Sequence, residues 1–158
     1  MSKIKVLFVC LGNICRSPLA EGIFKQRIAE RGLAHLFEAD SCGTAAYHIG
    51  EEADQRSVAN AKANGVDYHH LGRQLSSRDF LNFDLILPMD SSNLKNTEEL
   101  RPKGSETRVA LMRYYDMINP GSDVPDPYYG GPDGFQNVFE ILDRSVNALI
   151  DELVDIER

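Results

Sequence analysis

Basic residues are in deficit in this 158-residue sequence, which has 17 Lys and Arg against 24 Asp and Glu. The net charge of −7 argues against general nucleic-acid binding, which usually needs a basic face. An anionic substrate would also have to be attracted by a local feature, because the field of the whole molecule repels it.

Long apolar runs are missing as well. No segment approaches the roughly 20 residues that are needed to cross a membrane. The first apolar run, Ile4 to Cys10, contains Lys5 and no small-residue cleavage site follows it, so it does not fit a signal peptide. Cysteine is limited to three residues, an odd number that does not suggest a disulfide framework. We therefore expect a cytoplasmic protein with reduced thiols and no membrane association.

What the sequence does have is the composition of an ordinary globular domain. Hydrophobic residues make up 42% and charged residues 26% of the chain. A chain of this length buries on the order of 70% of its unfolded surface, which is enough for a stable core. Repeats, low-complexity tracts and linkers are not visible, so we expect a single domain over residues 1–158.

The spacing of apolar residues alternates between that of strands and that of helices. Short apolar runs predict buried strands, and spacings of three and four predict helices. The strands are expected at 4–10, 37–41, 83–87 and 107–112, and the helices from Pro18 to Gly32, at 54–64, at 91–100 and over about the last twenty residues. This alternation predicts an α/β three-layer sandwich, with a four-stranded parallel sheet and helices on both faces.

The loop between the first strand and the first helix has the features of an anion-binding site. In open α/β sheets, ligands bind at the carboxyl ends of the strands. After Cys10, several backbone N–H groups and a helix N-terminus point at one place, which suits a phosphate. Gly12 permits a tight path, and Asn13 adopts a positive φ at low cost. Arg16 adds a planar group that can bind two oxygens of the anion.

Cys10 is expected at the base of this phosphate-binding loop. The same dipoles would stabilise its thiolate, and Ser17 could donate a hydrogen bond to the sulfur. A buried structural cysteine is the plainest alternative. A nucleotide-binding loop would need Lys where Arg16 stands, and a zinc site would need more ligands at suitable spacing. The combination Cys-x5-Arg-Ser, after a strand and before a helix, favours a sulfur nucleophile in a phosphate site.

The segment CLGNICRSP at 10–18 resembles the signature of the low-molecular-weight protein tyrosine phosphatases. The similarity extends to DPYYG at 126–130 and to FDLILPMDSSNL at 83–94, and it covers essentially the whole chain in the right order. The resemblance implies a phosphoric monoester hydrolase that needs no cofactor or metal. Its partners would be tyrosine-phosphorylated proteins, and its product would be inorganic phosphate.

The resemblance also implies roles for three residues. Cys10 would attack phosphorus to form a phosphocysteine, while Arg16 and the loop amides hold the phosphate oxygens. Asp126 would protonate the leaving oxygen and later activate water. Apart from any family, Pro125 and Pro127 stiffen the backbone around Asp126, although Asp-Pro also occurs in ordinary turns. Weaker candidates for the acid are Asp116, Asp123 and Asp133.

Further residues are expected at the site by resemblance. Those that contact the substrate would be Leu11, Gly12, Asn13, Ile14, Cys15, Ser17, Tyr47, Tyr128 and Tyr129. The tyrosines would enclose an aryl ring, although Tyr47 fits a surface anchor equally well. Tyr128 and Tyr129 could themselves be phosphorylated. The residues expected to hold the loop by hydrogen bonds are Asn13, Ser17, Ser41 and His70, the last of which also fits an ordinary structural histidine.

Two further cysteines accompany Cys10. Cys15 could form a reversible disulfide with an oxidised Cys10, which would protect the nucleophile, and its alternative role is packing at the helix start. Cys42 stands where a small alanine is expected, and we attribute it to packing.

Three other functions compete with the tyrosine phosphatase interpretation. An arsenate reductase of the same fold needs additional cysteines late in the chain, and none follows Cys42. A phosphoarginine phosphatase usually has Thr in place of Ile14, whose apolar side chain favours a flat aryl ester. A non-catalytic phosphate-binding module would lack Asp126. We expect a protein that is mostly monomeric, with at most weak self-association.

Overall fold

Four parallel strands form the central sheet, in the order β2-β1-β3-β4. The computed structural model describes residues 2–128 and 131–157. The strands are β1 (Ile4–Cys10), β2 (Phe37–Gly43), β3 (Leu85–Pro88) and β4 (Arg108–Val109). In the sheet register, Cys10 pairs with Gly43 and Val9 with Pro88. The carboxyl ends of β1, β2 and β3 therefore meet at one edge, where the site is built.

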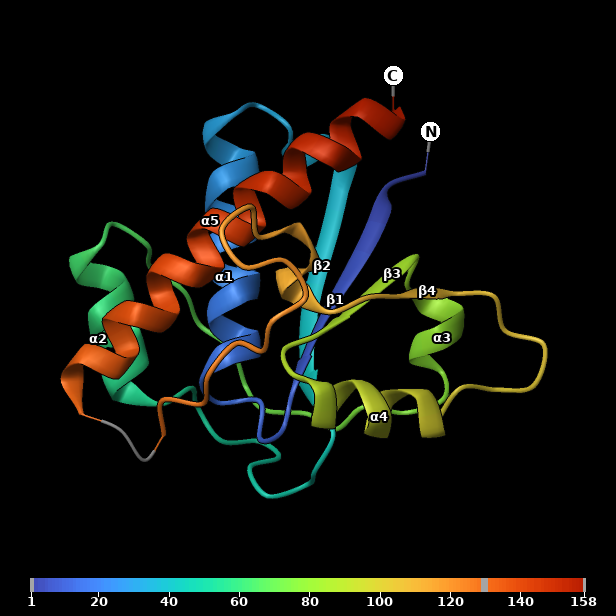
Figure 1. Ribbon diagram of the computed structural model, residues 1–158, viewed down its shortest axis with the longest axis horizontal. Coiled ribbons are helices and arrows are strands. Elements are labelled where there is room, and N and C mark those ends of the chain that lie inside the picture. Colours follow the sequence, from blue (N-terminus) through green and yellow to red (C-terminus); the bar gives the residue numbers. More distant parts are fainter. Residues whose placement is uncertain (1, 129–130, 158) are drawn as a thin grey trace.

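Helices cover both faces of the sheet, which confirms the predicted three-layer α/β fold (Figure 1). On one face, α1 (Arg16–Glu30) and α5 (Pro132–Glu157) pack side by side, and α2 (Gln55–Ala63) packs against them. On the other face lie α3 (Asp79–Asn82) and α4 (Ser91–Glu99). Two short 3₁₀ helices, η1 (Ala34–Leu36) and η2 (Met112–Tyr115), complete the elements.

From Val6 to Cys10, strand β1 is continuously apolar because this part of it is buried on both faces. Val6 and Phe8 belong to the larger core cluster, which includes residues of α1 and α5. Leu7 and Val9 point to the other face and pack in a smaller cluster with Phe80 of α3. Two apolar layers thus fix the strand that ends at Cys10.

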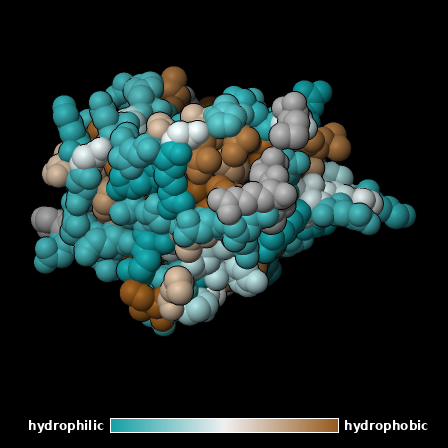
Figure 2. Space-filling model, turned by 90° about the horizontal axis from the view of Figure 1, so that it is seen from above, coloured by the Kyte–Doolittle hydropathy of each residue, from teal (hydrophilic) through white to brown (hydrophobic). Residues whose placement is uncertain are grey.

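The long C-terminal helix follows the predicted amphipathic pattern. Its buried side chains recur at spacings of three and four, and they include Val138, Leu142, Val146, Leu149 and Leu153. Within the residues that the structure describes, no helix has both the length and the apolar content to span a bilayer. Seen from the end where the chain termini lie, the surface is mostly hydrophilic, with hydrophobic side chains gathered in a few places (Figure 2).

Some predicted boundaries of strands were wrong. Strand β4 has two residues rather than the predicted 107–112, because the chain turns into η2 and buries Met112 in the core. Strand β3 spans Leu85–Pro88 rather than 83–87, and it ends at Pro88, opposite Val9. Helix α1 begins at Arg16, and Pro18 lies in its first turn, as predicted.

Candidate active site

The phosphate-binding loop joins β1 to α1, as predicted, and β2 supports it from the side. Backbone N–H groups of Thr44 and Ala45 donate to the carbonyl oxygens of Cys10 and Leu11, at 2.9 and 3.0 Å. A Cβ atom on Gly43 would lie 2.7 Å from the Leu11 oxygen, so the loop can approach β2 only because this residue is glycine. Sequence reasoning missed Gly43, since a glycine at a strand end does not reveal what passes beside it.

The sulfur of Cys10 lies at the bottom of this loop, buried, with two polar neighbours. Its Sγ atom is 3.0 Å from Oγ of Ser17, and the backbone N–H of Asn13 donates to it at 3.3 Å. Ser17 Oγ also lies 3.3 Å from the carbonyl oxygen of Cys42. The Ser17 hydroxyl and the Asn13 N–H can both donate a hydrogen bond to this sulfur.

Asn13 holds the loop in its curled shape. Its φ of 59° lies in the left-handed region, which asparagine tolerates better than most residues. Its side-chain Nδ2 donates to Ser17 and Ser41, and its Oδ1 accepts from the backbone N–H of Arg73 and lies 2.8 Å from Nε2 of His70. The structure thus brings together the four residues that were expected to support the loop. Asn13 and Ser17 lie beneath the loop rather than in the pocket lining.

A buried glutamate, Glu21, extends this network and was not predicted. It accepts from Ser41 Oγ at 2.7 Å and from Lys25 at 2.6 Å, and it lies 3.2 Å from Nδ1 of His70. Burial alone would raise the pKa of Glu21, but hydrogen bonds from His70, Lys25 and Ser41 outweigh it and lower the pKa. Glu21, Asp40 and His70 also place potential metal-ligand atoms within 4.8 Å of one another, behind the loop.

Arg16 is almost fully buried, and two acidic side chains hold its guanidinium. Nη1 donates to Asp90 at 2.7 Å and to the carbonyl oxygen of Val124 at 3.1 Å, and Nη2 lies 3.6 Å from the Asp126 carboxylate. Burial by itself lowers the pKa of Arg16, but Cys10, the hydrogen bond to Asp90 and the charge of Asp126 raise it above the usual value. The guanidinium therefore stays charged.

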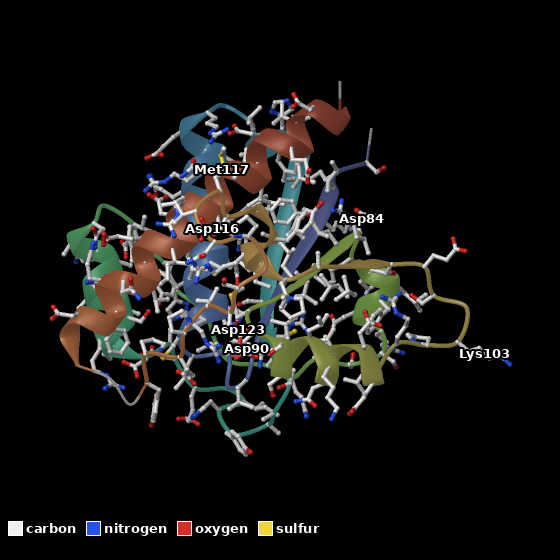
Figure 3. All side chains as sticks on the ribbon, viewed as in Figure 1. Asp84, Asp90, Lys103, Asp116, Met117 and Asp123 are labelled. Carbon is white, nitrogen blue, oxygen red and sulfur yellow. The ribbon has the colours of Figure 1, made fainter. Side chains whose placement is uncertain are left out.

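Asp90 was not predicted as a site residue, although it lies in the segment that carries the resemblance. Its carboxylate also caps α4 by accepting from the backbone N–H of Asn93 at 2.7 Å. Asp123 accepts a hydrogen bond from the backbone N–H of Ser91, the residue after Asp90, so both aspartates lie at the start of α4 (Figure 3). The sequence did show an aspartate between the end of a strand and the start of a helix. Helix capping alone explains an aspartate at that position, so it did not indicate a role in the site.

The segment that leads to Asp126 is anchored to the sheet. The N–H of Val124 donates to the carbonyl oxygen of Met89 just after β3. From there the chain brings the Asp126 carboxylate to the pocket, where Oδ1 accepts from the N–H of Tyr128 at 3.0 Å. The weaker candidates lie elsewhere: Asp116 is fully buried between Arg113 and Arg144, and Asp123 binds Ser91. Asp133 is exposed in the first turn of α5.

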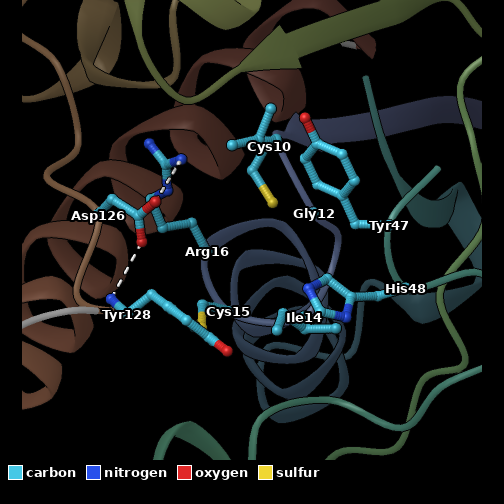
Figure 4. A pocket seen from close by; sticks show the side chains of 10 residues that line it. Cys10, Gly12, Ile14, Cys15, Arg16, Tyr47, His48, Asp126 and Tyr128 are labelled. Carbon is cyan, nitrogen blue, oxygen red and sulfur yellow. Dashed lines mark hydrogen bonds and ion pairs between the residues drawn. The ribbon is translucent and has the colours of Figure 1, made fainter. Parts of the chain in front are cut away.

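One pocket of about 180 Å³ collects the predicted catalytic side chains (Figure 4). Its rim includes Tyr47 and Tyr128, whose exposed fractions are 71% and 37%. Leu11, Gly12, Ile14 and Cys15 line it as expected, whereas Asn13 and Ser17, which were also expected to contact the substrate, do not. Tyr129 lies outside the described residues. The full lining is Cys10, Leu11, Gly12, Ile14, Cys15, Arg16, Tyr47, His48, Asp126 and Tyr128.

The second cysteine of the loop differs from the first in its surroundings. Burial, followed by the negative charges of Asp54, Cys10 and Asp126, raises the pKa of Cys15, so this residue is a neutral thiol beside Cys10. Burial likewise raises the pKa of Cys42, which packs in the smaller core cluster.

The sequence matches the family "Low molecular weight phosphotyrosine protein phosphatase" over residues 5–157. It is 48% identical to the protein of that name from Schizosaccharomyces pombe, over 92% of this chain and 95% of the relative. A protein tyrosine phosphatase structure from Entamoeba histolytica superposes with a TM-score of 0.94, at 38% identity, over 99% of this chain and 100% of the other. A Drosophila arginine phosphatase superposes with a TM-score of 0.87, at 34% identity, over 95% and 98% of the two chains.

The fold and these relatives define an enzyme, a hydrolase of the phosphatase class. The chain belongs to the low molecular weight phosphotyrosine protein phosphatase family.

Proposed function

We propose that this enzyme hydrolyses phosphotyrosine in proteins through a phosphocysteine intermediate on Cys10. The observation that supports this most strongly is the convergence of three side chains from two segments that are distant in sequence. Cys10, Arg16 and Asp126 line one pocket, and the last two lie within 3.6 Å of each other. A nucleophile, a fixed positive charge and a carboxyl group are the parts that a phosphoryl transfer through sulfur requires.

In the first step, the Cys10 thiolate attacks phosphorus and the bond to the tyrosine oxygen breaks. Asp126 gives its proton to that leaving oxygen. Arg16 and the backbone N–H groups of the loop bind the remaining phosphate oxygens, whose negative charge they stabilise in the transition state. Asp90 and the carbonyl of Val124 keep the guanidinium of Arg16 in place. These groups supply the positive charge without a metal ion.

In the second step, a water molecule attacks the phosphocysteine and gives its proton to the Asp126 carboxylate. The phosphorus–sulfur bond breaks, inorganic phosphate leaves, and the sulfur becomes a thiolate again. Ser17 and the N–H of Asn13 lie at hydrogen-bonding distance from this sulfur, so they stabilise the charge that returns to it. Ser41 and His70 act through Asn13, whose side chain they hold.

The walls of the pocket suit an aryl ring. Tyr47 and Tyr128 stand on its rim, and Ile14 adds an apolar side chain. Leu11, Gly12 and Cys15 complete the loop part of the lining. An aromatic ring gains from such contacts by burial and by ring–ring packing.

Cys15 is the thiol next to the nucleophile. If Cys10 is oxidised to a sulfenic acid, the Cys15 thiol would react with it to give a disulfide and release water.

The second candidate function is hydrolysis of phosphoarginine. It is favoured by the structural similarity to the Drosophila arginine phosphatase. The pocket wall argues against it, because Ile14 offers no hydroxyl to bind the N–H groups of a guanidinium. A buried donor without a partner is costly, so this apolar wall favours the phosphotyrosine ring.

A comparison of substrates tests the proposal. Peptides of one sequence that carry phosphotyrosine, phosphoserine or phosphoarginine are assayed for phosphate release, and phosphotyrosine is expected to give the highest kcat/KM. Ile14→Thr should improve phosphoarginine relative to phosphotyrosine by about tenfold, the worth of one hydrogen bond. Ile14→Val is the matched control, because it has nearly the shape of threonine without the hydroxyl. Faster release from phosphoarginine in the unaltered enzyme would overturn the proposal.

A further inference from the structure

An open groove continues from the mouth of the pocket towards the N-terminal end of α2. Ile14, His48 and Tyr128 line both the pocket and the groove, so the two are contiguous. When a phosphotyrosine ring occupies the pocket, the peptide residues on either side of it lie at the pocket mouth. The groove therefore lies where residues that flank the phosphotyrosine can be bound.

The charged groups of the groove are unequal in sign. Three carboxylates, those of Glu51, Glu52 and Asp54, face one guanidinium, that of Arg56. The Asp54 carboxylate binds this guanidinium at two points, at 2.8 and 3.1 Å, so these two charges offset each other. The negative charges of Glu51 and Glu52 are not offset by Arg56, and most of each side chain is exposed to solvent.

The guanidinium of Arg56 lies against two aromatic rings, in addition to its ion pair with Asp54. Its Cζ atom lies 5.3 Å from the ring centroid of Tyr128 and 4.9 Å from that of Phe135. The two rings and Asp54 thus occupy the guanidinium of Arg56, although half of this side chain is exposed, and the carboxylates of the groove outnumber it. His48 lies 3.0 Å from Glu51, and His69 lies 3.9 Å from Glu52.

We propose that this groove binds basic side chains next to the phosphotyrosine and so makes the enzyme select phosphotyrosine sites flanked by Lys or Arg. The inference rests on the proposed phosphotyrosine hydrolysis and names the substrate class more narrowly. Long cationic side chains can reach carboxylates at the rim of the pocket, and the overall charge of −7 acts in the same direction. An exposed pair of this kind changes kcat/KM by roughly two- to fivefold.

The test compares phosphotyrosine peptides with lysines, alanines or glutamates on both sides, at low ionic strength and pH 7. The unaltered enzyme should give the highest kcat/KM with the lysine peptide and the lowest with the glutamate peptide. Glu51→Lys/Glu52→Lys should reverse this order, and the ratio of kcat/KM between the lysine and glutamate peptides reports the reversal independently of any general change in the attraction of phosphates, which kcat/KM for p-nitrophenyl phosphate measures. Added salt should reduce the differences in kcat/KM among the three peptides, because it screens exposed charges.

Glu99→Lys/Glu106→Lys is the matched control, since it makes the same change in net charge at two exposed glutamates of α4 and the loop before β4. It should keep the original order of peptides. Equal kcat/KM for all three peptides in the unaltered enzyme, or the same reversal in the control, would overturn the groove proposal. Failure of the proposed function would look different, because a phosphoarginine peptide would then release phosphate faster than the phosphotyrosine peptides, whatever residues flank the phosphotyrosine.

Discussion

Asn13 shows how much of the site depends on single residues. Its left-handed backbone turns the loop, its N–H faces the sulfur, and its amide joins Ser17, Ser41 and His70. The sequence allowed the loop and this residue to be predicted, because Cys10 to Pro18 are consecutive. Glu21, Gly43 and Asp90 could not be predicted, because their roles arise from contacts with residues distant in sequence. Arg16 and Asp90, for instance, are 74 positions apart.

The proposed role of Asp126 as the acid can be tested by removing its proton. Asp126→Asn should lower kcat for phosphotyrosine by roughly 10²–10⁴, because an amide cannot supply the proton that the leaving oxygen needs. The loss should be smaller for p-nitrophenyl phosphate, whose leaving oxygen is less basic. Steady-state kinetics with both substrates measures this difference. Asp133→Asn is the control and should retain activity, and an equal loss of kcat with both substrates would argue against the acid role.

At the scale of elements, the segment before Asp126 is tied to α5 through one buried carboxylate. Asp116 accepts two hydrogen bonds from Arg144 of α5 and one from Arg113 of η2. Arg113 in turn donates to the carbonyl oxygen of Asp123, three residues before Asp126. The acid-bearing loop is thus held by a packed helix, although its own sequence has no regular period.

Asp116→Asn should destabilise the fold. Hydrogen bonds from Arg144, then the N–H of Ile118 and Arg113, outweigh burial and lower the pKa of Asp116. A lowered pKa in the folded state stabilises the fold above the unfolded pKa of about 4, and this contribution is lost as pH falls through the folded pKa. The variant should therefore be less stable by about 3 kcal/mol at pH 7, and the difference should shrink at lower pH.

Urea unfolding of both proteins at several pH values measures this effect. Asp143→Asn, which breaks a more exposed pair between Arg27 and Asp143, is the control and should cost less than about 1 kcal/mol. A difference between Asp116→Asn and the unaltered protein that stays constant down to the lowest pH would contradict the assignment.

The prediction of elements from the sequence succeeded where apolar patterns were long. Strand β1 has seven residues, of which the last five are buried, and α5 repeats its apolar stripe over many turns, so both were clear. The pattern missed α3, which has four residues, and it made β4 too long, because a strand of two residues shows no period that marks its ends. Their positions are set by tertiary contacts, such as the burial of Phe80 and Met112.

At the scale of the whole molecule, the net charge and the site act in opposite directions on a phosphate. The chain carries −7, yet the predicted nucleophile lies in a loop supported by a buried, charged Arg16. We therefore expect recognition of the phosphate to be local, with the surrounding negative charge free to attract basic substrate segments, as proposed above. The proposed chemistry depends on Cys10 at the centre of this local site.

Trapping of the covalent intermediate tests that role most directly. Asp126→Asn, which slows the attack of water, is mixed with p-nitrophenyl phosphate, quenched within milliseconds and digested for mass spectrometry. We predict one phosphoryl group on the peptide that contains Cys10, formed as fast as the first p-nitrophenolate is released, and no turnover by Cys10→Ser. Turnover by Cys10→Ser, or a phosphoryl group on any other residue, would contradict the account.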